Sequence, residues 1–367
     1  MWIYKRIIKP ILFKIDPEKI HDRAIRAGVF WGSGFLRKNL IGLVYDYKNK
    51  KLETDVLGIK FRNPIGLAAG FDKNAEITDI IPYVGFGFGE VGSITGEHCE
   101  GNKKPRLWRL PKDKAIAVYY GLKNDGAEVI SERLRDKRFR IPIGINIAKT
   151  NDPSIKGRKS VEDYYKAYKL TENIGDYTTI NISCPNTGDG RSFEDPELLE
   201  ALLKKIGKTK RIIFLKISPD LTKSNVDKLV AVCDKYSVSG FIISNLSKKK
   251  DNLKTSEDIL ASVKGGISGE PAKKKSDELI KYVYRKTKGK YVIIGCGGIF
   301  TAEDAYKKIK NGASLVQLIT GMIYQGPGVI KKINKRLVKL LEDDGYNNIK
   351  EAVGVDVKNW LNNKDKK

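Results

Sequence analysis

The stretch YVIIGCGGIFTAEDAYKKIKNGASLVQLITG, residues 291–321, contains the repeating unit that decides the fold. An apolar run at Tyr291–Gly295 ends in glycines, Thr301 follows as a candidate helix N-cap, and a second apolar run begins at Ser314. Continuous apolar runs suit strands that are covered on both faces, and a strand, a helix and a second strand in this order form a parallel βα unit. The stretch therefore predicts two neighbouring strands of a parallel sheet.

The same unit recurs along most of the chain. The apolar runs are Ile65–Ala69, Gly87–Ile94, Ile141–Ile147, Thr178–Ser183, Ile212–Ile217, Gly240–Ser244, Tyr291–Gly295 and Ser314–Ile319. Eight βα units predict an α/β fold, a (β/α)8 TIM barrel. A doubly wound open sheet is the alternative, but no G-x-G-x-x-G motif follows an early strand. We expect an N-terminal amphipathic helical extension at residues 1–45, the barrel at 46–345 and a C-terminal tail at 346–367.

Composition narrows the possible functions. The chain has 69 Lys and Arg against 44 Asp and Glu, a net charge of +25, which favours nucleic acid, acidic lipid or a phosphorylated ligand as partner. Lysines scattered over helix faces in a lysine-rich proteome would give the same charge. Four cysteines without a C-x-x-C pair and two histidines argue against a metal site, so no metal is expected. They also argue against Ser-His-Asp and Cys-His hydrolysis.

The N-terminal segment reads as two helices. Isoleucines and a leucine recur at helical spacing between residues 3 and 15, with lysines and an arginine between them. Asp16 is a candidate N-cap and Pro17 suits the first position of a second helix. No apolar run is long enough to cross a bilayer. Two interpretations remain open: a helical hairpin packed on the barrel, or a basic amphipathic element on an anionic membrane surface.

Polar residues stand inside or directly after the apolar runs. Asn146, Asn181 and Lys216 would point into or over the barrel mouth, and buried polar groups need partners. Glycines follow the last two runs, where such barrels often bind phosphate at a helix N-terminus. A phosphorylated heterocycle is the expected ligand, and flavin mononucleotide (FMN) fits. Lys216 would lie near the electron-rich end of the flavin, since a fixed cation stabilises the reduced ring.

Nine stretches resemble one known family. They are NPIGLAAGFDKN (63–74), GFGEVGSITG (87–96), KPRLWRLP (104–111), IGINIAKT (143–150), INISCPNT (180–187), LKISPDL (215–221), GGISGEP (265–271), IIGCGGI (293–299) and GASLVQLITG (312–321). In this order they resemble the dihydroorotate dehydrogenases, and specifically the membrane-associated, quinone-dependent class 2. The segment FKIDPEKIHDRAI (13–25) resembles the membrane-docking helical pair of that class.

The resemblance implies an activity and a set of site residues. The activity is FMN-dependent oxidation of (S)-dihydroorotate to orotate in pyrimidine (UMP) biosynthesis, with electrons passing to a membrane quinone. It implies a peripheral location on the cytoplasmic side of the cell membrane, with the N-terminal helices on its anionic surface and no nucleic-acid partner. The implied FMN contacts are Ala68, Ala69, Gly70, Ser93, Asn146, Asn181, Lys216, Ser244, Gly269, Gly298, Ile319 and Thr320. Those implied for the substrate are Lys73, Asn181, Asn186 and Asn245, with Cys184 as catalytic base and His21 and Arg109 at the quinone site.

The sequence also departs from the family pattern. Cys184 stands where the quinone class usually has serine, although a thiol is the stronger acid and is competent as a base. Val118 and Lys123 replace asparagines that contact the substrate, and Leu246 replaces a hydroxyl residue. Such losses could change substrate choice. The alternatives are therefore an FMN barrel acting on a related dihydropyrimidine or on dihydrouridine in tRNA, and a non-catalytic FMN-binding membrane-associated protein.

Overall fold

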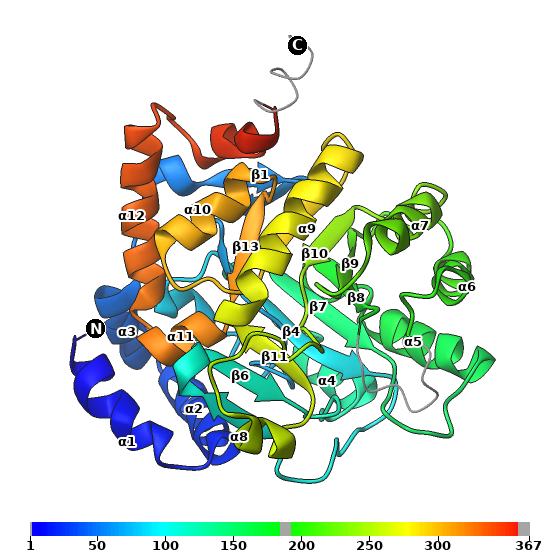
Figure 1. Ribbon diagram of the computed structural model, residues 1–367, viewed down its shortest axis with the longest axis horizontal. Helices are drawn as coiled ribbons and strands as arrows, with labels where there is room; N and C mark the ends of the chain where they lie inside the picture. Colours follow the sequence, from blue (N-terminus) through cyan, green and yellow to red (C-terminus); the bar gives the residue numbers. More distant parts are fainter. Residues whose placement is uncertain (1, 184–191, 359–367) are drawn as a thin grey trace.

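A closed barrel of parallel strands forms the centre of the computed structural model, which describes residues 2–183 and 192–358 (Figure 1). Neighbouring strands follow the chain order, and β13 pairs with β3 to close the barrel. The predicted TIM barrel is confirmed, because each of the eight predicted runs contains or overlaps one barrel strand. The strands are β3 (Ile65–Leu67), β4 (Phe88–Thr95), β7 (Ile143–Ala148), β8 (Tyr177–Asn181), β9 (Ile213–Ile217), β10 (Gly240–Ile243), β12 (Val292–Cys296) and β13 (Leu315–Leu318).

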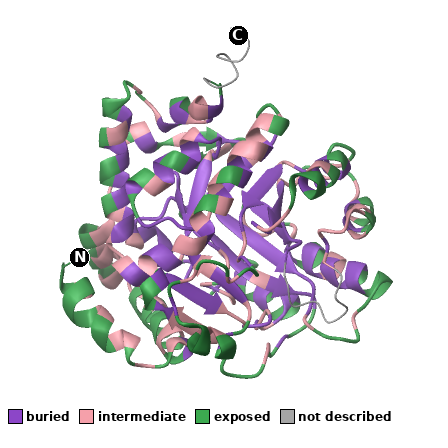
Figure 2. Cartoon of the chain, viewed as in Figure 1, coloured by how far each residue is buried: buried purple, intermediate pink, exposed green. Residues whose placement is uncertain are grey.

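Amphipathic helices cover the outside of the barrel, with buried strands inside and exposed helix faces outward (Figure 2). In α10 the buried residues Ala302, Ala305 and Ile309 recur at helical spacing and face the barrel. Thr301 caps this helix as predicted: its hydroxyl accepts from Asp304 N, and the Asp304 carboxylate bonds back to Thr301 N. The covering helices are α4 (Ala127–Leu134), α5 (Arg158–Thr171), α6 (Pro196–Ile206), α7 (Lys223–Cys233), α9 (Lys273–Lys286), α10 (Ala302–Lys310) and α12 (Val329–Asp343).

Additional strands close the two ends of the barrel. The antiparallel pair β1 (Thr54–Val56) and β2 (Ile59–Phe61) forms a hairpin whose apolar side chains pack on the amino-terminal end of the barrel interior. At the opposite end, β5 (Leu107–Leu110), β6 (Ala115–Val118) and β11 (Gly266–Gly269) form a three-stranded antiparallel sheet beside the mouth. The sequence did not predict this mouth sheet. Two short helices, α8 (Glu257–Ser262) and α11 (Thr320–Gln325), belong to the same end.

The N-terminal segment is helical and packs beside the mouth. A short π-helical turn (Tyr4–Ile8) leads into α1 (Lys9–Phe13), followed by α2 (Pro17–Ser33) and α3 (Phe35–Tyr45). Asp16 caps α2, with Pro17 at its first position, as predicted; the side chain accepts from Lys19 N at 2.9 Å. The third helix was not predicted separately.

A buried ion pair joins α2 to the barrel mouth. Arg106, just before β5, donates to both carboxylate oxygens of Glu18 in α2, at 2.7 and 3.2 Å, and both side chains are about 95% buried. Partnered buried charges of this kind hold two elements in one geometry. Within residues 2–183 and 192–358, no helix has the length and apolarity needed to cross a membrane.

Candidate active site

A cavity of about 630 Å³ opens between the carboxyl ends of the barrel strands, the mouth sheet and the N-terminal helices. This volume lies within the range of small-molecule sites. Most of the predicted site residues line it, although their side chains come from almost every barrel strand and from α2. The lining residues among them are His21, Ala68, Ala69, Gly70, Lys73, Ser93, Arg109, Asn181, Lys216, Ser244, Asn245, Gly269, Gly298, Ile319 and Thr320.

Three predicted residues are not in this lining. Asn146 is fully buried one layer below, where its amide bonds to Ser93 and to Glu90. Its place in β7 points the side chain into the barrel interior, so it supports the mouth from beneath. Cys184 and Asn186 lie outside the described residues, and their assignments stay predictions.

Glycines let the loops after β12 and β13 pack together at one side of the cavity. Gly298 has φ +70°, and a Cβ there would lie 2.4 Å from the Cβ of Lys273. A Cβ at Gly321 would lie 2.0 Å from the carbonyl oxygen of Ile299. Only glycine tolerates such backbone approach. The glycines therefore allow the close backbone packing at this side of the cavity, where the amides of Phe300 and Thr301, directly before α10, donate to the Asp304 carboxylate.

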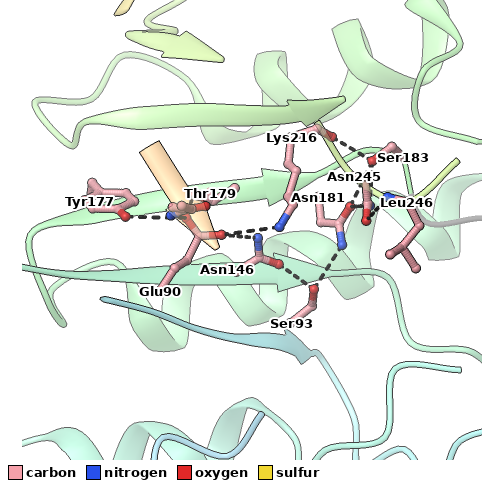
Figure 3. Close-up of polar contacts among 11 residues, drawn as sticks. Glu90, Ser93, Asn146, Tyr177, Thr179, Asn181, Ser183, Lys216, Asn245 and Leu246 are labelled. Carbon is pink, nitrogen blue, oxygen red and sulfur yellow. Dashed lines mark hydrogen bonds and ion pairs between the residues drawn. The ribbon is translucent and has the colours of Figure 1, made fainter. Parts of the chain in front are cut away.

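A chain of hydrogen bonds crosses the barrel mouth from β4 to the end of β10 (Figure 3). Ser93 Oγ donates to Asn146 Oδ1 at 2.5 Å, and Asn181 Nδ2 donates to Ser93 Oγ at 3.0 Å. Asn245 Nδ2 in turn donates to Asn181 Oδ1 at 3.0 Å. Three sequence-distant amides and one hydroxyl are thus connected in a single polar surface. We name this series, Asn146–Ser93–Asn181–Asn245, the amide chain.

Lys216 reaches the cavity from β9 and lies next to a carboxylate. Its Nζ atom is 4.0 Å from Glu90 Oε1, and both side chains are buried. The backbone carbonyl of Lys216 accepts from Ser183 Oγ at 3.0 Å, and Asn245 Nδ2 donates to the same hydroxyl at 2.8 Å. Ser183, the last described residue before residues 184–191, is thus held at the barrel mouth by two hydrogen bonds.

Lys73 and His21 meet inside the cavity. Lys73 Nζ lies 3.3 Å from His21 Nε2 and 4.0 Å from the centre of the Tyr120 ring. Burial lowers the pKa of Lys73 to about 8, against the opposing effect of Asp22 and Glu18. Burial and the neighbouring Lys73 lower the pKa of His21 to about 4. Near neutral pH this pair is therefore a charged lysine beside a neutral imidazole.

Arg109 lies on the side of the cavity that faces α1. Its guanidinium donates to the carbonyl oxygen of Ile15 at 2.7 Å and lies 4.7 Å from the centre of the Phe13 ring. Arginine near the carboxyl end of a helix satisfies carbonyls that have no helical partner. Arg109 thus holds the turn between α1 and α2 against the mouth sheet, in the same cavity as His21.

One wall of the cavity is formed at the mouth sheet by the apolar side chains of Val118 and Leu246. Val118 pairs with Gly266 in the mouth sheet, and a Cβ at Gly266 would lie 2.6 Å from Leu246 Cβ. Val118, Leu246 and Lys123 all line the cavity, so the three departures found in the sequence gather around one site.

Sequence reasoning missed three polar residues of this region. Glu90 and Gln317 are buried in the barrel beneath the mouth, and Tyr120 lies under Lys73. Glu90 and Gln317 each stand within an otherwise apolar or glycine-rich run, as Asn146 does, so the same signal could have found them.

Comparisons with known proteins identify the family of this chain. The family model described as dihydroorotate dehydrogenase matches residues 51–341. The "Dihydroorotate dehydrogenase (quinone)" of Nostoc punctiforme is 39% identical over 381 aligned positions, covering 98% of this chain and 99% of that protein. That of Natronomonas pharaonis is 38% identical, covering 97% and 100%. The crystal structure of Eimeria tenella DHODH in complex with ferulenol superposes with a TM-score of 0.82 at 32% identity, covering 93% of this chain and 96% of that one. The chain therefore belongs to the dihydroorotate dehydrogenase family.

Proposed function

We propose that this protein oxidises (S)-dihydroorotate to orotate in pyrimidine biosynthesis and passes the electrons through FMN to a quinone. Family membership over nearly the whole chain supports the reaction. The observation that carries the proposal is the cavity at the barrel mouth, whose largely apolar lining also contains Lys73, Lys216 and the amides of Asn181 and Asn245.

The residues present fit a flavin. Ser244 Oγ and Gln317 Oε1 are buried beside the cavity without a hydrogen-bond partner, and buried polar groups rarely remain so. The glycine-lined loops after β12 and β13 offer backbone amides to a phosphate. FMN would be held by Ala68, Ala69, Gly70, Ser93, Asn181, Lys216, Ser244, Gly269, Gly298, Ile319 and Thr320, with Asn146 holding Ser93 from beneath. When bound, it supplies a hydride acceptor that can return electrons to a second substrate.

The substrate would be held by charge and by amides. Lys73 would pair with the carboxylate of dihydroorotate, because a charge-assisted hydrogen bond in a buried site is strong and directional. Asn181, Asn186 and Asn245 would bond the amide-like edges of the ring, and Lys216 would stabilise negative charge that develops on the cofactor side.

Cys184 is the proposed base that removes the proton from carbon 5 of the substrate. A thiol has a reference pKa of about 8.5, so its thiolate is accessible near neutral pH in a way that an alkoxide is not. Ser183 directly before it is fixed by Lys216 O and Asn245, and a base works best when its position is fixed.

The site for the quinone, the electron acceptor, would lie between the N-terminal helices and the barrel mouth. His21 and Arg109 are the proposed quinone contacts. We also propose that the N-terminal helices rest on the anionic cytoplasmic surface of the cell membrane as a peripheral anchor. Large apolar side chains exposed on these helices support this: Trp2, Ile3, Ile7, Ile8, Ile11, Val29, Phe30, Trp31, Phe35, Leu36, Leu40, Leu43 and Val44.

Anaerobic titration tests the reaction. Dihydroorotate should bleach the oxidised flavin of the purified protein, and a soluble quinone should restore the colour. A series of related dihydropyrimidines tests whether the apolar wall of Val118 and Leu246 has changed substrate choice. A flavin that dihydroorotate leaves oxidised while another dihydropyrimidine bleaches it would overturn the proposed substrate.

A further inference from the structure

Glu90 is a buried carboxylate to which no step of the proposed reaction assigns a role. It stands in β4 with no exposed surface, inside the barrel beneath the cavity. Burying a carboxylate costs free energy unless donors surround it. Its Oε1 accepts from Asn146 Nδ2 at 2.8 Å, and its Oε2 accepts from Thr179 Oγ1 at 3.1 Å (Figure 3). Gln317 Nε2 also donates to Oε2, at 3.1 Å. Every one of these contacts is a donor pointing at Glu90.

This carboxylate sets the direction of the amide chain from its β4 end, while the Leu246 backbone N–H, which donates to Asn245 Oδ1 at 2.9 Å, holds Asn245 at the other end. An ionised carboxylate only accepts, whereas an asparagine amide can turn either its oxygen or its nitrogen toward a neighbour. Glu90 therefore holds the NH2 group of Asn146, which leaves Asn146 Oδ1 free to accept from Ser93. With its proton committed there, Ser93 Oγ accepts from Asn181 Nδ2, and Asn181 Oδ1 then accepts from Asn245 Nδ2. All four donors point back toward Glu90.

The direction matters because Asn181 and Asn245 both line the cavity. A flipped amide would present an oxygen where a nitrogen stands, and so would exchange an attractive contact for a repulsive one. Sites that bind through hydrogen bonds discriminate strongly for this reason. We propose that Glu90 is a positioning residue that fixes the amide orientation of Asn181 through Asn146 and Ser93, without touching the substrate. This inference rests on the function proposed above.

If Glu90 acted only on its immediate neighbour Lys216, a different experimental result would be expected. Glu90 also lies 4.0 Å from Lys216 Nζ, and as a counter-ion for that lysine it would act without the chain. The two roles separate at Ser93, which is the only hydroxyl link in the chain and does not contact Lys216 through any described hydrogen bond. Removing this link should abolish an effect carried by the chain and leave a counter-ion effect unchanged.

The experiment is a double-mutant cycle with Glu90→Gln and Ser93→Ala, using orotate as the probe. Its dissociation constant is measured from the change it causes in the absorbance of the oxidised flavin, and FMN content is measured separately. Glu90→Gln should keep FMN and weaken orotate binding by about tenfold, because glutamine can offer Asn146 either a donor or an acceptor. The double variant should bind orotate less than about twofold more weakly than the Ser93→Ala variant does.

Thr179→Val is the matched control, because it removes a hydrogen bond to the other oxygen of Glu90 and leaves the chain intact. It should change orotate binding by less than about twofold. Orotate binding to Glu90→Gln that equals the parent, additive losses in the double variant, or loss of FMN from Glu90→Gln would each overturn the proposal. If the parent protein itself shows neither orotate binding nor bleaching by dihydroorotate, the proposed function fails instead.

Discussion

Raising the pH should weaken orotate binding, because Lys73 is the cation proposed to pair with the carboxylate. Burial lowers the pKa of Lys73 from 10.5 to about 8. The lysine is therefore mostly charged at about pH 7 and mostly neutral at about pH 9, and its charged fraction falls roughly tenfold between them. A bound carboxylate favours the charged lysine, so the dissociation constant of orotate should rise by about the same factor.

The assay is titration of the oxidised enzyme with orotate at a series of pH values, because product binding does not require the catalytic base. Lys73→Met should bind orotate roughly ten- to hundredfold more weakly at neutral pH, the loss of one hydrogen bond to a charged group. It should also lose the dependence on pH. If the dissociation constant of orotate in the parent protein stayed constant between about pH 7 and pH 9, Lys73 would not be the residue that pairs with the carboxylate. The same conclusion would follow if Lys73→Met kept the pH dependence of the parent protein.

Three other variants, one of them a double substitution, test the remaining roles. Cys184→Ala should keep FMN yet slow flavin reduction by dihydroorotate at least about hundredfold in stopped flow, and an unchanged rate would exclude Cys184 as the base. Changing Phe35 and Leu43, which are 72% and 78% exposed, to serine should reduce sedimentation with anionic vesicles and spare orotate binding. Val129→Ser, at a 51% exposed position on α4, is the matched control, and equal loss in both proteins would contradict helix docking. Gly298→Ala should lower FMN content, because its Cβ would collide with Lys273; full occupancy would show that this loop does not hold the cofactor.

The sequence predicted the barrel well because its signal is strong and repeated. Eight apolar runs, each followed by a helical segment, leave few other folds, and the structure adds only small changes at the strand ends. The mouth sheet was missed for the opposite reason. Its strands have four residues each and lie in loops between barrel strands, where so short a pattern has little weight.

The candidate site was predicted residue by residue, mainly through the family resemblance, and the cavity gathers most of those residues. Two aspects needed the three-dimensional structure. The role of Glu90 depends on partners from three other strands, which only the closed barrel brings together. The contact between His21 and Lys73 depends on how α2 lies across the mouth, and no local pattern encodes that packing.

The pairing of β13 with β3 also affects how the protein is made in the cell. The first and last strands of the barrel join residues near 65 and 316, so a nascent chain cannot close the cylinder until nearly all of it has left the ribosome. Until then β3 lacks one of its two hydrogen-bonded neighbours, and unpaired strand edges of this kind promote aggregation. Slow translation or a scarcity of chaperones should therefore reduce the yield of this protein more than that of a protein with mainly local contacts.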